Sequence, residues 1–346
     1  MAKSSKAGNI ELQQEYVLCG PDLNYHTTCE FSAGTFNSSN FDYSWNFQKF
    51  KEGFSIVVKD VKDERMEFDM IGADPSLANA FRRIMISEVP TVAIEHVFFI
   101  NNTSVIADEV LAHRLGLVPI GVDPRLFVTK KDDESASEKN SLVFKLHVAC
   151  KKSTKQKVVS GDLVWLPMGT EMPTETNCNF MNDQQKHLKL KSVKPFYSDI
   201  LLAKMRPGQE IQLEAHCCKG IGREHAKWSP VATAWYRLQP EVVLLKDVEG
   251  ERAKTLAQEF SGLFVTEKKD GKTVAKVTQA RGNEKLLEKV RRYSGEDAWK
   301  DTLQLRKKKR HIIFTVESVG QYKAKEIFLE AVDILIGKCD KLIESL

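Results

Sequence analysis

The sequence predicts an α+β fold in which strands and two strongly apolar helices flank a β-rich middle segment. Apolar residues alternate over 54–70 and recur at helical spacing over 74–88 and from about 321 to the C-terminus. These are the periods of half-buried strands and of amphipathic helices. Between them, short strand-like pieces alternate with turns that contain Gly and Pro. With 346 residues, 42% hydrophobic and 28% charged, the chain is globular and long enough for two domains.

Residues 1–49 are rich in Ser, Asn, Gln and aromatic residues without a sustained period, which predicts an irregular N-terminal arm. After it come two short runs with one apolar face each, separated by a turn at 62–64. We therefore expect a hairpin of two half-buried strands. Their apolar residues are Phe54, Ile56 and Val58, then Met66, Phe68 and Met70.

A helix is predicted over 74–88, because Asp74 and Pro75 supply an N-cap and a first-turn proline and apolar residues follow at helical spacing. Pro90 ends it. The middle of the chain, about 88–230, is predicted to form a small β-rich domain. Its expected strands are 97–100, 144–148, 211–217 and 231–236, with a short helix at 107–115 and loops at 130–140 and 151–160.

The C-terminal part begins with a helical, charged stretch at 250–305, followed by a strand at 311–318 and a final helix from about 321. One seam of that helix steps by three and four: Phe328, Val332, Leu335, Cys339, Leu342 and Leu346. With its apolar flanks the seam covers roughly 220° of the helix, whereas a one-sided surface helix needs an apolar stripe little wider than about 100°. The helix must therefore be covered on two sides. The second cover is either the chain's own second domain or a partner helix, and the coiled-coil spacing favours a partner.

The helix over 74–88 shows a weaker version of the same pattern. Its back carries Asn79, Arg82 and Arg83 together with Ile86. A solvated face is one interpretation. Paired arginines are also typical of an interface rim or of a site that holds carboxylates.

The formal net charge of +4 depends on one run, Arg306, Lys307, Lys308, Lys309 and Arg310. Removing these five positive charges from +4 leaves −1 for the other 341 residues. A nucleic-acid-binding protein spreads its basic residues over a whole face. The run is typical of a solvated loop, with nuclear targeting or phosphate contact as the other readings, and a free-standing nucleic-acid-binding protein stays open as an alternative.

The sequence contains none of the motifs G-x-x-x-x-G-K-[ST], G-x-S-x-G or H-E-x-x-H, and no C-x-x-C pair among its seven cysteines. A metal-dependent enzyme would have to use residues such as His147, Cys150, His216, Cys217 and Cys218, which are better explained as buried side chains. No signal peptide and no apolar stretch of about 20 residues is present. We expect a reducing compartment, cytosol or nucleus, and no membrane.

Four blocks carry a resemblance to a known family. Residues 79–95 read NAFRRIMISEVPTVAIE and residues 101–120 read NNTSVIADEVLAHRLGLVPI. Residues 206–211 read RPGQEI, and 220–232 read GIGREHAKWSPVA. Together they closely resemble the alpha-like subunits of DNA-directed RNA polymerases. Within that family the chain is most similar to the larger alpha-like subunit that eukaryotic RNA polymerases I and III share, and the resemblance covers most of the chain from about 54.

The resemblance implies a split dimerisation domain, about 50–88 plus 230–346, interrupted by an insert domain at about 89–229. It implies a heterodimer with a smaller alpha-like subunit, whose contact residues here would be Phe81, Ile84, Met85, Phe328, Val332, Leu335, Cys339 and Leu342. By the same carry-over, Asn79, Arg82 and Arg83 match the positions that dock on the second-largest polymerase subunit. Other expected partners are the largest catalytic subunit and the small polymerase subunits, with DNA reached only through the complex.

The function implied is that of a non-catalytic scaffold, which nucleates assembly of the two catalytic subunits in enzymes that transcribe rRNA precursors, 5S rRNA and tRNAs. The expected location is the nucleus, nucleolus and nucleoplasm, with assembly possible in the cytoplasm. No catalytic residue, cofactor or metal is expected. Relatives in RNA polymerase II and in many archaea carry a metal-binding cysteine cluster in the insert, and residues 89–229 lack that cluster here. An alpha-like subunit of another polymerase is the remaining alternative.

Overall fold

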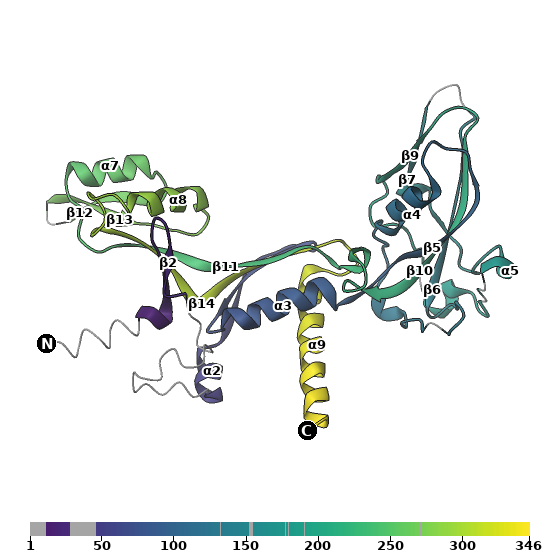
Figure 1. Ribbon diagram of the computed structural model, residues 1–346, viewed down its shortest axis with the longest axis horizontal. Helices are drawn as coiled ribbons and strands as arrows, with labels where there is room; N and C mark the ends of the chain where they lie inside the picture. Colours follow the sequence, from purple (N-terminus) through teal and green to yellow (C-terminus); the bar gives the residue numbers. More distant parts are fainter. Residues whose placement is uncertain are drawn as a thin grey trace. The chain divides into compact units, whose positions relative to one another are not determined.

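The computed structural model of the protein (Figure 1) describes residues 12–27, 46–131, 133–151, 155–176, 178, 180–189, 191–269 and 271–346. Helices and strands are mixed along the chain, which confirms the predicted α+β class. The chain divides into two compact units. The first unit holds residues 1–59, 67–79 and 236–314, and the second unit holds residues 60–66, 80–235 and 315–346.

These units do not coincide with the expected split domain and insert. The last helix, α9 (Ala324–Glu344), and most of helix α3 (Pro75–Ser87) belong to the second unit, together with the β-rich middle of the chain. The division at 50–88, 89–229 and 230–346 stays a prediction.

The first unit is built on a sheet with the strand order β2-β1-β14-β4-β3, and β11 pairs with β14 beside this path. The strands are β1 (Tyr16–Cys19), β2 (Asn24–Tyr25), β3 (Ser55–Val61), β4 (Arg65–Ile71), β11 (Val231–Leu244) and β14 (Leu303–Ser318). Strand β4 has the expected half-buried pattern, and its Phe68 stacks on Phe314 of β14 with ring centroids 5.3 Å apart. Four of these strands, β3, β4, β11 and β14, also contribute residues to the second unit.

Three expectations for this sheet were wrong. Strand β3 pairs with β4 as expected, but it is exposed along its whole length rather than half-buried, because it lies at the edge of the sheet. The described part of the N-terminal arm is not irregular: Tyr16 of β1 lies opposite Lys308 of β14, and helix α2 (Phe47–Gly53) follows later. Strand β14 begins at Leu303 and therefore contains the basic run that was expected to be a loop.

Residues 250–305 hold α7 (Glu251–Glu259), α8 (Glu284–Tyr293) and a hairpin that the sequence did not reveal, β12 (Phe264–Lys269) with β13 (Lys272–Val277). Phe260 anchors this region, since its ring lies edge-on to those of Phe264 and Tyr293 with centroids 5.7 and 5.1 Å away. The buried cluster around it includes Leu256, Leu263, Val290 and Trp299. The first unit therefore has a hydrophobic core of its own.

The second unit contains a sheet with the order β5-β10-β6-β8 and a pair β7-β9. The strands are β5 (Pro90–Asn102), β6 (Ser141–Ala149), β7 (Gln156–Val159), β8 (Val164–Trp165), β9 (Leu201–Met205) and β10 (Glu210–Ile221). The β-rich middle is thus confirmed, although β7 lies in a segment expected to be a loop. The short elements are α4 (Asp108–Gly116), α5 (Pro173–Thr176), α6 (Gln184–His187), η2 (Pro124–Leu126), η3 (Ser160–Asp162) and η4 (Ala226–Trp228).

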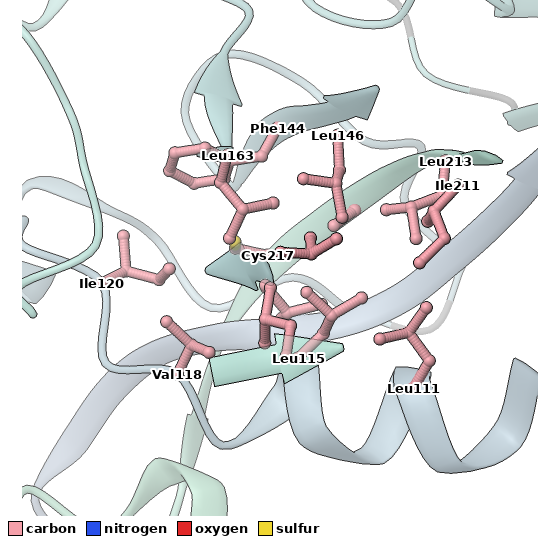
Figure 2. Packing of buried hydrophobic residues seen from close by; sticks show 14 of the residues in the cluster. Leu111, Leu115, Val118, Ile120, Phe144, Leu146, Leu163, Ile211, Leu213 and Cys217 are labelled. Carbon is pink, nitrogen blue, oxygen red and sulfur yellow. The ribbon is translucent and has the colours of Figure 1, made fainter. Parts of the chain in front are cut away.

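The core of the second unit forms where α4 meets the sheet (Figure 2). Leu111 and Leu115 are one helical turn apart and both are fully buried. From β10, Leu213 and Cys217 point toward them, as period two requires. Acidic residues in the first turn of α4 and basic residues in its last turn match the helix dipole. In the part of the chain that the structure describes, no helix is long and apolar enough to cross a membrane.

Candidate protein–protein interface

The first half of α9 is part of the chain's own core. Ala324, Ile327, Phe328 and Ala331 are buried, and the Phe328 ring contacts that of Phe81 on α3 with centroids 5.2 Å apart. Because the apolar faces of α3 and α9 meet here, the two helices are held together by ordinary core packing.

Four residues of the expected dimer contact are buried within the chain itself, and their role in a dimer stays a prediction. Phe81, Ile84, Met85 and Phe328 are 7%, 3%, 0% and 8% exposed, so they offer almost no surface to a partner in this structure. The helical period placed these four residues on the correct faces of α3 and α9. It could not indicate that the chain itself covers those faces.

From Val332 to the end of the chain, the apolar residues are partly or fully exposed. Ile336, Leu342 and Ile343 are 54%, 66% and 69% exposed, and Cys339 is exposed as well. At about 100° per residue, they share one face of roughly 120° with Val332, Leu335 and Leu346. We call this the α9 face: Val332, Leu335, Ile336, Cys339, Leu342, Ile343 and Leu346. Such contiguous apolar surface on a soluble protein marks an interaction site.

Charged residues occupy the sides of α9 outside the α9 face. Asp333, Asp340, Lys341 and Glu344 lie on the opposite side of the helix at about 100° per residue. Lys338 reaches back to α3, where its Nζ lies 2.5 Å from Glu88 Oε1. Sequence reasoning missed this ion pair, because the two residues are 250 positions apart and no local pattern links them. It holds the exposed half of α9 beside the end of α3.

The expected docking residues share one turn of α3. Asn79, Arg82 and Arg83 are three and four positions apart, so their side chains leave the helix on the same side, away from the buried Ile84 and Met85. Arg83 is exposed, whereas Asn79 and Arg82 are partly buried. The structure thus brings the three residues together, and their role in docking stays a prediction.

The basic run of β14 is engaged by the protein itself. The Arg306 guanidinium lies 2.5 Å from Glu241 Oε2 and 3.9 Å from the centroid of the Tyr16 ring. Lys308 lies 3.3 Å from the same glutamate, and Lys309, only 8% exposed, donates to the Gln13 carbonyl at 2.6 Å. These contacts replace the expected solvated loop. A role of the run in targeting or phosphate contact stays a prediction.

Two of the residues considered for metal binding are engaged by carboxylates of the chain itself. His147 pairs with Glu210 at 2.7 Å, and His216 contacts Glu214 at 3.4 Å. Burial raises the pKa of the Cys217 thiol and lowers the pKa of His216, so both side chains favour their neutral forms. Among the described residues, no three His, Cys, Asp or Glu side chains are grouped as a metal site requires.

Strands with two packed helices, one of which ends in an exposed apolar face, are typical of a domain that packs against another protein. The chain belongs to the RNA polymerase Rpb3/Rpb11 dimerisation domain family, whose profile matches residues 67–339. This assignment spans both the segments expected to dimerise and the β-rich middle between them.

Relatives from several eukaryotes are similar over most of their length. Subunit RPAC1 of DNA-directed RNA polymerases I and III from Mus musculus is 40% identical in an alignment that covers 93% of this chain and 92% of the mouse protein. The same subunit from Saccharomyces cerevisiae is 41% identical, and that alignment covers 88% of this chain and 91% of the yeast protein. Subunit 3 of RNA polymerases II, IV and V from Arabidopsis thaliana is 32% identical, with 85% of this chain and 91% of the plant protein covered.

Proposed function

We propose that the protein is a non-catalytic core subunit of DNA-directed RNA polymerases I and III, and that it forms a heterodimer with a smaller alpha-like subunit. One observation carries the proposal: the α9 face is uncovered in a chain of the dimerisation-domain family. The choice of polymerases rests on identity, since the relatives from polymerases I and III reach 40–41% and the relative from polymerases II, IV and V reaches 32%.

Burial of the α9 face by a partner helix supplies the driving force in this proposal. Removing apolar surface from water contributes about 25 cal/mol per Å², from which the entropic cost of association is subtracted. Leu342 and Ile343, each about two-thirds exposed, have the most surface to lose. The contact is apolar, and its strength therefore depends little on salt.

The heterodimer would then serve as the platform on which the catalytic subunits assemble. Arg82 and Arg83 fit this role chemically, because guanidinium groups pair with carboxylates in two parallel hydrogen bonds. We assign Asn79, Arg82 and Arg83 to contact with the second-largest subunit. We propose that the subunit works in the nucleus and nucleolus, where the two enzymes would make rRNA precursors, 5S rRNA and tRNAs.

The proposal predicts the effect of a charge in the α9 face. Leu335→Asp and Leu342→Asp should each lower co-purification of the smaller alpha-like subunit at least ten-fold, because burial of an unpaired carboxylate is costly. Leu342→Asp is the more informative variant, because Leu342 is 66% exposed and its replacement does not disturb the chain's own core. The measurement is the yield of the pair after co-expression and affinity purification of the full chain.

Lys341→Asp is the matched control, because it adds a carboxylate one residue away but on the polar side of α9. It should leave the yield of the pair unchanged. The heterodimer assignment is wrong if Leu342→Asp retains the partner as well as this control does. Binding of nucleic acid by the full chain that weakens steeply between low and moderate salt would instead favour the alternative of direct phosphate binding by the basic run.

A further inference from the structure

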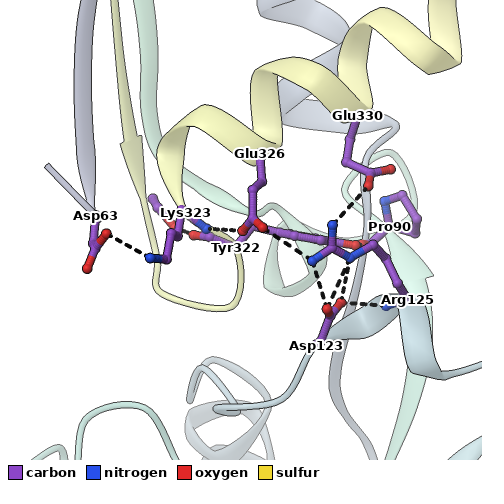
Figure 3. A network of polar contacts seen from close by, with 9 residues as sticks. Asp63, Pro90, Asp123, Arg125, Tyr322, Lys323, Glu326 and Glu330 are labelled. Atoms are coloured by element: carbon purple, nitrogen blue, oxygen red, sulfur yellow. Dashed lines mark hydrogen bonds and ion pairs between the residues drawn. The ribbon is translucent and has the colours of Figure 1, made fainter. Parts of the chain in front are cut away.

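A surface ion cluster around Arg125, which the function above does not use, lies at the base of α9 (Figure 3). Arg125, in the short helix η2 of the β-rich middle, lies 2.8 Å from Asp123 Oδ2 and 3.3 Å from Glu326 Oε1. Its second terminal nitrogen lies 3.8 Å from Glu330 Oε1. The guanidinium also covers the Tyr322 ring, 5.5 Å from its centroid. One cation thus joins two turns of α9 to a distant segment of the second unit.

A second set of contacts holds the residues just before α9. The Gln321 amide accepts a hydrogen bond from the Val92 N–H at 3.1 Å and donates one to the Val92 carbonyl at 2.5 Å. The Tyr322 hydroxyl donates to the Pro90 carbonyl at 3.2 Å. Gln321 therefore bonds to strand β5 as a neighbouring strand would, through both backbone groups of one residue.

The turn that leads into these residues is closely packed. Gly320 has φ = +116°, and a Cβ added there would lie 2.4 Å from the Phe196 ring. The lack of a side chain at Gly320 thus lets the β-rich middle approach the chain just before α9. We call the whole arrangement the α9 clasp: Asp123, Arg125, Phe196, Gly320, Gln321, Tyr322, Glu326 and Glu330.

The charges of the clasp make Arg125 its central residue. Three carboxylates, those of Asp123, Glu326 and Glu330, converge on this one guanidinium. Without it, Lys219 would still attract Asp123 and Glu330, but the repulsion among the three carboxylates would be less compensated, and the base of α9 would be held less firmly beside η2. With it, the cluster has a single favoured geometry, because the planar guanidinium fixes the direction of each bond.

We propose that the α9 clasp sets the direction of α9 and so positions the α9 face for its partner, with Arg125 and Gln321 as positioning residues that touch no partner themselves. The proposal rests on the function proposed above. Sixteen residues separate Glu326 from Leu342, about 24 Å of helix at 1.5 Å per residue. A tilt of about 10° at the base would therefore move Leu342 by about 4 Å, enough to misplace an apolar contact.

The clasp acts together with two other contacts on α9, the packing of Phe328 on Phe81 and the ion pair of Lys338 with Glu88. Loss of the clasp should therefore weaken the heterodimer without abolishing it. This distinguishes a positioning residue from a residue of the α9 face, whose replacement by aspartate should remove binding altogether.

The test uses the purified heterodimer of the full chain and follows exchange of its smaller alpha-like subunit for a fluorescently labelled copy. Arg125→Gln and Gln321→Ala should each speed exchange at least ten-fold. Arg206→Gln is the control, because Arg206 is an exposed arginine of the same unit and lies outside the clasp. It should exchange at the wild-type rate.

Rescue separates positioning from general loss of structure. Replacing Glu326 and Glu330 by Gln in the Arg125→Gln background removes the repulsion and should restore slow exchange at least in part, and Arg125→Lys should lie between wild type and Arg125→Gln. If Arg125→Gln folds poorly, the milder pair Glu326→Gln with Glu330→Gln in the wild-type background should still speed exchange. Wild-type exchange in both Arg125→Gln and this pair, or no recovery in the combined variant, overturns the clasp proposal. Retention of the partner by Leu342→Asp would instead overturn the proposed function.

Discussion

Two single residues show how closely the backbone and the core constrain the sequence. Gly72, after strand β4, has φ = +81° and donates its N–H to the Arg310 carbonyl at 2.7 Å. A Cβ at this position would lie 2.2 Å from the Gly53 carbonyl oxygen. His216, on β10, is 3% exposed and lies against the edge of the Phe98 ring. A methyl group at position 72 would therefore overlap the backbone, and the imidazole at position 216 is shielded from water.

Gly72→Ala should destabilise the protein by two separable effects. A left-handed backbone costs a residue with a Cβ roughly 1–2 kcal/mol, and the overlap with Gly53 adds to it. Gly271→Ala is the matched control, because Gly271 has φ = +78° but open space where its Cβ would be. Thermal melting should show a clearly larger loss for Gly72→Ala. Equal losses would mean that backbone strain alone matters at position 72.

His216 should make stability depend on pH. Burial lowers the pKa of His216 in the folded chain, His96 and Lys130 add to this effect, and Glu214 opposes it. The unfolded chain therefore takes up the proton first, at about pH 6.5, and stability falls as the pH falls below that value. His216→Gln should lose less stability than the wild type between pH 7.5 and pH 5.5 in thermal melts. Identical pH dependence in the two proteins would contradict the assignment.

At the scale of elements, the two long apolar helices were predictable because their period is local. The spacing of Leu77, Phe81 and Ile84 indicates α3, and the seam of α9 is visible in the same way. Strand β14 was found only in part, since its run of charged side chains hides the alternation of period two. Strand β1 was missed because it pairs with residues about 290 positions away, which no local pattern encodes.

For the candidate interface, the sequence predicted which side of α9 is apolar but not which part of that side is exposed. The same apolar period runs through Phe328 and Leu342, yet the first is 8% exposed and the second 66%. Period reports which side of a helix is apolar; whether the chain or a partner covers that side depends on tertiary packing. The clasp was unpredictable for a related reason, because Arg125 and Glu326 are 201 positions apart.

At the scale of the whole molecule, each unit buries a large hydrophobic cluster, whereas much of the α9 face is exposed to solvent. The proposed function assigns this exposed face to a partner protein. Membership of the dimerisation-domain family and about 40% identity to subunits of RNA polymerases I and III support that proposal. The proposed function requires that a partner protein covers the α9 face.

Thiol labelling of Cys339 tests that claim most directly, because this residue lies within the α9 face and its thiol is exposed. Maleimide modification of Cys339, followed by peptide mass spectrometry, is compared in the full chain before and after it binds the smaller alpha-like subunit. The account predicts labelling at least ten-fold slower in the heterodimer. Unchanged labelling of Cys339 in a heterodimer that has demonstrably formed would contradict it.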